Sequence, residues 1–75
     1  MELEIKCFAS LAEHSPPGGI LRAVPEKAAV GQVMDMLGIA RDDVKIIFIN
    51  GTHADAQTEL KDGDRLGLFP AVGGG

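Results

Sequence analysis

The chain has 75 residues, which is enough for one small domain, and its sequence contains neither an apolar run long enough to cross a membrane nor a basic leader segment. Its net charge of −4 leaves no basic patch for nucleic acid, and its single cysteine cannot form an internal disulfide, as is typical of a reducing compartment. We therefore expect a soluble cytoplasmic protein with no nucleic-acid or membrane partner. The acidic balance favours a protein partner with a basic docking surface.

The N-terminal segment predicts the clearest strand. Glu2–Phe8 alternates polar and apolar residues, so Leu3, Ile5 and Cys7 share one face. We interpret Cys7 as a small core residue rather than a nucleophile, because no histidine lies nearby in the sequence to activate it. Phe8 falls on the polar face, where it either forms an exposed contact or folds back over the core, and the pattern leaves both possibilities open.

A loop and a second strand follow. Prolines and glycines at 16–19 predict a loop within Ala9–Gly19, and Ile20–Val24 predicts a short strand paired with the first in an antiparallel hairpin. His14 lies in this loop and His53 lies far along the chain. Because neither has other ligand types at metal spacing, no metal site is predicted.

One helix is predicted over Ala28–Leu37 from the spacing of its apolar residues. Gly38 marks its C-terminal end, where a left-handed residue is favourable. The start is less defined, because no Ser, Thr, Asp or Asn stands just before Val30 to cap it. The apolar stripe expected to cover the sheet consists of Val30, Val33, Met34 and Leu37.

The second half of the chain predicts strands separated by turns. Lys45–Ile49 is almost continuously apolar, which predicts a strand buried on both faces near the centre of the sheet. It ends at a strong turn signal, Asn50-Gly51. We expect a short strand around His53 and a turn or 3₁₀ segment near Thr58.

The Asp-Gly-Asp sequence at 62–64 predicts another turn, with its glycine at positive φ. A calcium site is disfavoured here because the spacing supplies no further oxygen ligands. Arg65–Phe69 predicts the last strand, with Leu66 and Leu68 pointing inward and Phe69 on the opposite face.

The order of these elements is a hairpin, one helix and then two or three strands. This order predicts an α+β fold of the ubiquitin-like β-grasp type, with a mixed sheet of four to five strands and one helix packed across it. We assign residues 1–72 to the β-grasp domain and residues 73–75 to a flexible tail.

The chain ends in Gly73-Gly74-Gly75, which contributes no side chain to a core. Because glycine loses more conformational freedom on ordering than any other residue, we expect the tail to be mobile. A thread without Cβ atoms can enter a narrow channel and place the Gly75 carboxylate in the active site of another protein. Three glycines alone also fit a frayed terminus, so the preceding residues decide between these interpretations.

Over essentially its whole length the sequence resembles the ThiS/MoaD family of ubiquitin-like sulfur carrier proteins. The most specific feature is the Asp-Gly-Asp turn leading through one strand into Phe-Pro-x-Val-Gly-Gly-Gly at the terminus, which favours a functional tail. Weaker matches are Lys6-Cys7-Phe8-Ala9, Val30-Gly31-Gln32-Val33 and Ile49-Asn50-Gly51.

The resemblance implies a carrier with no catalytic residues of its own and no bound cofactor or metal. A ubiquitin-activating-like adenylyltransferase would use ATP to convert the Gly75 carboxylate into an acyl-adenylate. A sulfur donor, either a cysteine desulfurase or a rhodanese-type protein, would then leave a C-terminal thiocarboxylate on the Gly73-Gly74-Gly75 tail. An acceptor synthase, such as the large subunit of molybdopterin synthase or thiazole synthase, would take the sulfur.

The resemblance also implies a partner-binding surface near the tail. By the family pattern, Phe8 and Phe69 lie on the exposed face of the sheet, and we hypothesise that they form an apolar anchor rimmed by acidic residues. Pro70, Val72 and His53 complete the predicted partner-binding set.

Four functions remain open from the sequence. Phe8-Ala9 and Phe69-Pro70 resemble the small subunit of molybdopterin synthase, although Ala71 replaces the usual second proline. The triple glycine also resembles the carrier that serves thiamin thiazole synthesis. From other functional classes, the chain could be a ubiquitin-like protein modifier joined through Gly75 to lysines, or a β-grasp interaction module with an inert tail.

Overall fold

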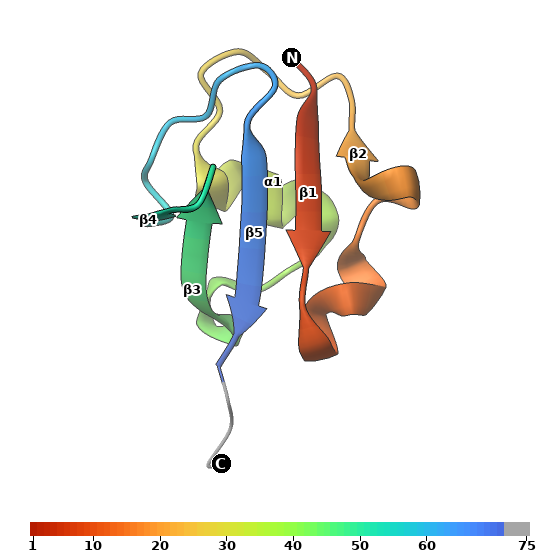
Figure 1. Cartoon of the computed structure of the whole chain (residues 1–75), viewed down its shortest axis with the longest axis vertical. Coiled ribbons are helices and arrows are strands. Elements are labelled where there is room, and N and C mark those ends of the chain that lie inside the picture. The colour runs from red at the N-terminus through yellow and green to blue at the C-terminus, as the bar shows by residue number, and fades with distance from the viewer. Residues whose placement is uncertain (72–75) are drawn as a thin grey trace.

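The computed structural model describes residues 1–71, which form one mixed sheet and one α-helix (Figure 1). The strands are β1 (Leu3–Cys7), β2 (Ile20–Leu21), β3 (Val44–Ile49), β4 (Thr52–Ala54) and β5 (Arg65–Pro70), and the helix is α1 (Val30–Leu37). Three short 3₁₀ helices, η1 (Ala9–His14), η2 (Pro17–Gly19) and η3 (Arg41–Asp43), lie in the connections. The strand order is β2-β1-β5-β3-β4, with β1 parallel to β5 and the other pairs antiparallel. The predicted α+β class, with one helix and a mixed sheet, is confirmed.

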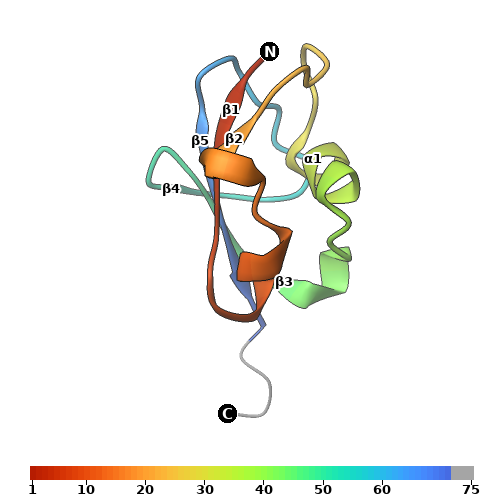
Figure 2. The same cartoon turned by 90° about the vertical axis from the view of Figure 1, so that its right-hand side faces the viewer.

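The helix and the sheet form two layers, with the core between them (Figure 2). The predicted alternation in β1 holds, since Leu3, Ile5 and Cys7 are buried and the residues between them are exposed. The helical stripe is also confirmed, with Val30 and Val33 fully buried. The core is aliphatic apart from Cys7 and Met34, and its members are Leu3, Ile5, Cys7, Leu11, Val24, Ala28, Val30, Val33, Met34, Ile39, Ile47, Leu60, Leu66 and Leu68.

The β1–β2 hairpin is present, but its second strand is shorter than the predicted Ile20–Val24. Regular pairing stops after Leu21 because Ala23 adopts a left-handed conformation with φ of 61°. The pairing resumes beyond this interruption, where Met1 and Val24 exchange backbone hydrogen bonds of 2.6 and 2.9 Å. The sequence pattern carried no sign of the kink, because alanine rarely adopts positive φ.

The helix begins two residues later than predicted, at Val30, and its first amide groups are capped by a distant loop. The Val30 N–H donates to the Thr58 carbonyl oxygen at 3.0 Å, and the Gly31 N–H donates to that of Ala56 at 2.8 Å. These contacts explain why no Ser, Thr, Asp or Asn is needed before the helix. At the other end Gly38 has φ of 75°, as predicted for a left-handed cap.

The prediction that the apolar run in β3 is buried on both faces at the sheet centre was wrong. Ile47 is 8% exposed, but its neighbour Ile46 is 37% exposed. The helix covers one face of the sheet only, and β5, flanked by β1 and β3, takes the central position. One face of β3 is therefore left uncovered.

The predicted turns are confirmed and have structural roles. Asn50 and Gly51 both have positive φ, 52° and 81°, as a two-residue turn between β3 and β4 requires. In the Asp-Gly-Asp turn, the Asp62 carboxylate accepts the Glu2 N–H at 2.7 Å, and the Asp64 carboxylate accepts the amide of Asn50 at 2.9 Å. The turn thereby ties the start of β5 to the strands on either side of it.

Candidate functional site

The uncovered face of the sheet carries all three phenylalanines of the chain. Because Ile46 is opposite Phe69 and Phe48 is opposite Gly67 across β3 and β5, these side chains lie on the face away from α1. Phe8 follows β1 and reaches the same face, where its ring stacks on that of Phe69. This arrangement decides between the two interpretations of Phe8 in favour of a surface position. We call Phe8, Phe48 and Phe69 the aromatic cluster.

The rings of the aromatic cluster pack on one another in defined geometries. Phe8 and Phe69 are stacked with their centroids 4.1 Å apart and their planes 6° from parallel. Phe48 meets Phe69 edge-on at 5.7 Å and 82°. His53, on β4, meets the other side of Phe48 at 4.4 Å and 64°. The cluster is therefore preorganised, since each ring is held by a neighbour.

An open depression of about 910 Å³ lies over this face. It exists partly because Gly67, in the middle of β5, has no side chain between the rings. A Cβ atom there would lie 3.7 Å from Phe8, 3.8 Å from Phe69 and 3.9 Å from Phe48. The depression is also lined by Glu4, Lys6, Gly18, Gly19, Gly51 and Arg65.

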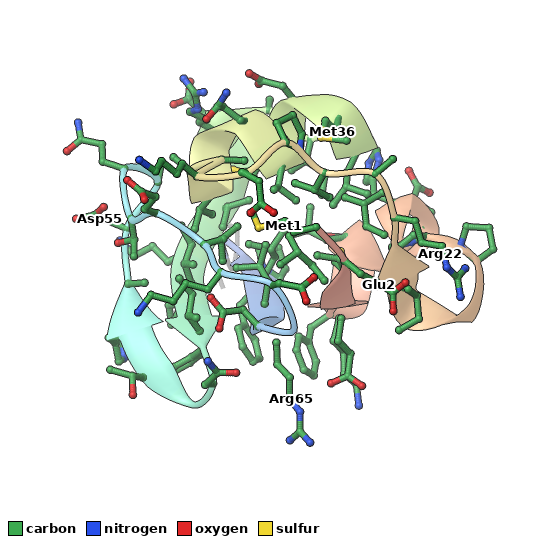
Figure 3. The ribbon with its side chains drawn as sticks, turned by 90° about the horizontal axis from the view of Figure 1, so that it is seen from above. Met1, Glu2, Arg22, Met36, Asp55 and Arg65 are labelled. Atoms are coloured by element: carbon green, nitrogen blue, oxygen red, sulfur yellow. The ribbon has the colours of Figure 1, made fainter. Side chains whose placement is uncertain are left out.

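The rim of the aromatic cluster is not acidic, so the hypothesis of an acidic rim was wrong. The charged strand residues on this face are Glu4, Lys6 and Arg65. The Lys6 ammonium lies 5.4 Å from the centroid of the Phe8 ring, and the Arg65 guanidinium pairs with the Glu4 carboxylate at 2.9 Å. Figure 3 shows Arg65 projecting from the sheet on the side opposite to α1. The net charge of the chain is negative and wrongly predicted a negative charge around the rings, because ten of the 11 acidic side chains lie away from these strand positions.

The C-terminal segment leaves the sheet beside the aromatic cluster. Pro70, the last residue of β5, lies opposite Val44 of β3, and the Ala71 N–H donates to the Asp43 carbonyl oxygen at 3.2 Å. Phe69 therefore lies two residues before the last residue described. Of the predicted site residues, Val72 and the Gly73-Gly74-Gly75 tail with its expected mobility lie outside the described residues.

The structure brings Phe8, Phe69 and His53 together on one face, as the sequence predicted, with Pro70 at its edge. Phe48 was missed because it lies in the continuous apolar run of β3, which favoured burial. Its position could have been found from the register, since a strand covered on one side only exposes alternate residues. Lys6 was assigned to the polar face of β1 but was not predicted to border the rings, because the sequence alone does not show that its ammonium lies beside the Phe8 ring.

Cys7 lies on the opposite, inner face of the sheet and is 6% exposed. Burial raises the pKa of its thiol above the ordinary value, and a hydrogen bond with the Ser15 side chain opposes that shift. The interpretation of Cys7 as a core residue is confirmed.

Cys7 should therefore resist alkylation in the folded protein. A raised pKa leaves less thiolate at neutral pH, and burial restricts access, so we expect native iodoacetamide labelling to be roughly tenfold slower or more than in concentrated guanidinium chloride. Rapid and equal labelling under both conditions would contradict the buried position.

Comparison with known protein families matches the chain to the ThiS family over residues 5–75. The chain belongs to the ThiS family. Among solved structures, this ThiS-family chain is similar to SAMP1 from Haloferax volcanii, with 30% identity over all of both chains and a TM-score of 0.72. A second structure of that small archaeal modifier protein 1 has 29% identity over 95% of this chain and 98% of its own, with a TM-score of 0.71.

A structure from Pyrococcus furiosus described as molybdopterin converting factor, subunit 1 is also similar to the ThiS-family chain. It has 25% identity over 96% of this chain and 99% of its own, with a TM-score of 0.69. A comparison with curated protein sequences gave no match. These relatives confirm the ubiquitin-like β-grasp fold and the resemblance to ThiS/MoaD sulfur carriers.

Within residues 1–71, no helix has the length and apolar character needed to cross a bilayer. In the same residues, no three or more histidine, cysteine, aspartate or glutamate side chains gather so that they could hold a metal ion.

Proposed function

We propose that this protein is a sulfur carrier whose Gly75 carboxylate is adenylated and then converted to a thiocarboxylate. The observation that carries the proposal is that the ThiS-family match extends through the Gly-Gly-Gly sequence to the last residue of the chain. The aromatic cluster supports it, because a preorganised apolar surface adjoins the strand that leads into this sequence.

The chemistry proceeds in steps that the partners catalyse. The Gly75 carboxylate attacks the α-phosphorus of ATP, which forms the acyl-adenylate and releases pyrophosphate. A persulfide on a sulfur donor then attacks the acyl carbon and displaces AMP, giving an acyl disulfide. A thiol of the donor cleaves the S–S bond, so the carrier leaves as a thiocarboxylate and the donor is left with a disulfide.

The carrier's role in this scheme is to dock and to present its terminus. The described histidine and cysteine side chains, which could serve nucleophilic or acid–base chemistry, each have a structural contact or a buried position. His14 contacts the Leu37 carbonyl oxygen at 3.3 Å, His53 packs against Phe48, and Cys7 is buried on the other face. Catalysis is therefore assigned to the adenylyltransferase, the sulfur donor and the acceptor synthase.

The acceptor that we favour is a molybdopterin synthase large subunit. The similarity to the molybdopterin converting factor subunit from P. furiosus supports this assignment, as does the Phe69-Pro70 ending. Thiazole synthase is the alternative acceptor, since the matching family takes its name from the ThiS carriers. Reconstitution of the thiocarboxylated carrier with each synthase in turn would test which of them accepts the sulfur.

A second candidate function is a protein modifier joined through Gly75 to lysines. It is favoured by the similarity to SAMP1, the small archaeal modifier protein. The same adenylation step serves both functions, so they diverge only in the nucleophile that attacks the acyl-adenylate. Lysine conjugates on a blot from the native cell would support the modifier.

The experiment that tests the carrier function is mass spectrometry of the C-terminal peptide after incubation with the activating enzyme, ATP and a sulfur donor. Replacing one oxygen of Gly75 with sulfur adds nearly the same mass as oxidising a methionine, so the change must be mapped to the last peptide and trapped with an alkylating reagent. The Cys7→Ala variant removes the only thiol of the chain, so labelling then reports the thiocarboxylate alone.

We expect one alkylated terminal peptide per chain and no label on a variant that lacks Gly75. Formation of the acyl-adenylate without a trapped thiocarboxylate, together with lysine conjugates, would replace the carrier function with the modifier function. Failure of adenylation with every ThiS-type activating enzyme of the source cell would overturn both.

A further inference from the structure

The turn between β3 and β4 contains the only asparagine of the chain, Asn50, followed directly by Gly51. An asparagine side chain can lose its amide group when the backbone nitrogen of the next residue attacks it. A glycine in that next position favours the attack, because it has no Cβ to obstruct the ring that forms. A Cβ at Gly51 would meet no atom of residues 1–71 within 4 Å apart from its chain neighbours, so there is space for the ring.

The Asn50 side chain is held by the start of β5. Its Nδ2 donates to the Asp64 Oδ1 at 2.9 Å, and its Oδ1 accepts the Arg65 N–H at 3.0 Å. The Asn50 N–H also donates to the Arg65 carbonyl oxygen at 2.9 Å, which extends the β3–β5 pairing beyond the last strand pair. Both ends of the side-chain amide are therefore engaged, although Asn50 itself is exposed to water.

We propose that Asn50 is a deamidation site whose reaction the Asp64 contact restrains and whose product weakens the β3–β5 pairing. The Gly51 nitrogen attacks the Asn50 Cγ and loses its proton, the Cγ–Nδ2 bond breaks, and ammonia leaves with that proton. The resulting succinimide ring is opened by water at either of its two carbonyl carbons, which gives aspartate or isoaspartate. The net change is amide plus water to carboxylate plus ammonium, and it is independent of the adenylation and sulfur transfer proposed for Gly75.

The contacts with β5 oppose the first step of this reaction. The Asn50 Cγ becomes tetrahedral when it is attacked, so Oδ1 and Nδ2 both leave the positions in which they bind Arg65 and Asp64. The contact with the Asp64 carboxylate is the stronger restraint, because a hydrogen bond to a charged group exceeds one between neutral groups. Deamidation therefore requires local opening of the turn or unfolding.

Neither product can restore the contacts of Asn50. An aspartate at this position still accepts the Arg65 N–H but has no N–H to donate to Asp64, and like charges placed opposite each other are destabilising. An isoaspartate adds one carbon to the backbone of a two-residue turn with φ of 52° and 81°, which disrupts the register of β3 and β4. Because neither product returns to asparagine, the reaction converts the chain permanently to a less stable form.

The first test compares two variants of the Asp-Gly-Asp turn. Asp64→Ala removes the acceptor of the Asn50 Nδ2 and also that of the Lys61 N–H. Asp62→Ala, the matched control, removes the acceptor of the Glu2 N–H and leaves the contacts of Asn50 in place. The full-length folded proteins are incubated at neutral pH, and deamidation of Asn50 is followed by mass spectrometry. Urea denaturation measures the stability of each variant, and wild type in concentrated urea gives the unrestrained rate.

We expect folded wild type to deamidate more slowly than the unfolded chain, and Asp64→Ala to deamidate about tenfold faster than Asp62→Ala, as the loss of one hydrogen bond to a charged group predicts. Asp64→Asn keeps one acceptor oxygen and should react at an intermediate rate, so it provides the same comparison if the alanine variant does not fold. Equal rates for Asp64→Ala and Asp62→Ala, or a slower reaction in Asp64→Ala than in wild type, would overturn the restraint by Asp64.

The second test measures the effect of the product with Asn50→Asp. We expect a lower urea midpoint than in wild type, with a gap that narrows as salt rises. Adding Asp64→Asn exchanges the amide and the carboxylate, which restores an N–H donor opposite an acceptor, so the double variant should recover stability. An Asn50→Asp variant as stable as wild type, or no recovery in the double variant, would overturn the weakening of the β3–β5 pairing by the product.

Discussion

Replacing Leu68 with alanine is expected to lower the free energy of unfolding by about 3 kcal/mol, within the range for truncating a buried leucine. Leu68 is 0% exposed and lies in β5, the central strand. Its neighbours across the sheet, Cys7 in β1 and Ile47 in β3, are also buried, so the change leaves a cavity within the core.

A domain of this size has a total stability of only several kcal/mol, so the Leu68→Ala protein should be partly unfolded at room temperature. Urea denaturation followed by circular dichroism measures the loss. Ile46→Ala is the matched control, because Ile46 is an aliphatic residue of the same sheet that is 37% exposed. If the two variants lose equal stability, the assignment of the two faces of the sheet is wrong.

Replacing Phe69 with alanine is expected to raise the KM of the activating enzyme for this carrier by about 30-fold, which corresponds to a hot-spot loss of roughly 2 kcal/mol. Phe69 contacts both other members of the aromatic cluster, stacking on Phe8 and meeting Phe48 edge-on. Its removal therefore disorders the whole anchor and also deletes contact area next to the C-terminal segment.

The same change costs some stability, about 1 kcal/mol for the lost ring pairs, so activation must be measured where circular dichroism shows a folded variant. Met36→Ala is the control for an exposed apolar residue, since Met36 is 48% exposed and lies on α1, away from the sheet (Figure 3). Wild-type activation kinetics for Phe69→Ala would rule out the aromatic cluster as the docking anchor. An equally large rise in KM for Met36→Ala would show that the loss of docking is not specific to the aromatic cluster.

Local patterns in the sequence predicted much of the fold. The period-two alternation of β1 identified its buried face, and the spacing of Val30, Val33 and Met34 identified the buried face of the helix. The glycines that must adopt positive φ, at Gly38, Gly51 and Gly63, marked the ends of elements correctly. Each of these signals depends on residues close together in the sequence.

The features that could not be predicted depend on contacts between distant segments. The start of α1 is fixed by carbonyl groups of Ala56 and Thr58, which no residue near the helix reveals. Five core residues lie outside the strands and the α-helix as the structure bounds them, namely Leu11, Val24, Ala28, Ile39 and Leu60. For Leu11, Ile39 and Leu60, no periodicity in the sequence identifies a buried position.

The candidate site was predicted only in part, because it also depends on contacts between distant segments. Phe69 could be assigned to the outer face from strand alternation, but alternation left the position of Phe8 open, and Phe48 required knowledge that only one face of β3 is covered. The sign of the charge around the rings required the register of β1 against β5, which brings Glu4 and Arg65 side by side. Composition reports the total charge and contains no information on its placement.

The hydrogen bond between the Ala71 N–H and the Asp43 carbonyl oxygen fixes the chain to the end of the sheet as far as Ala71. Four residues, 72–75, lie between this point and the carboxylate of Gly75. Even if fully extended, four residues span at most about 14 Å. An enzyme that acts on Gly75 must therefore have its reacting atoms within that depth of the surface on which the domain rests. While the Ala71 hydrogen bond is kept, length alone prevents Gly75 from reaching a deeper active site, before any side chain is recognised.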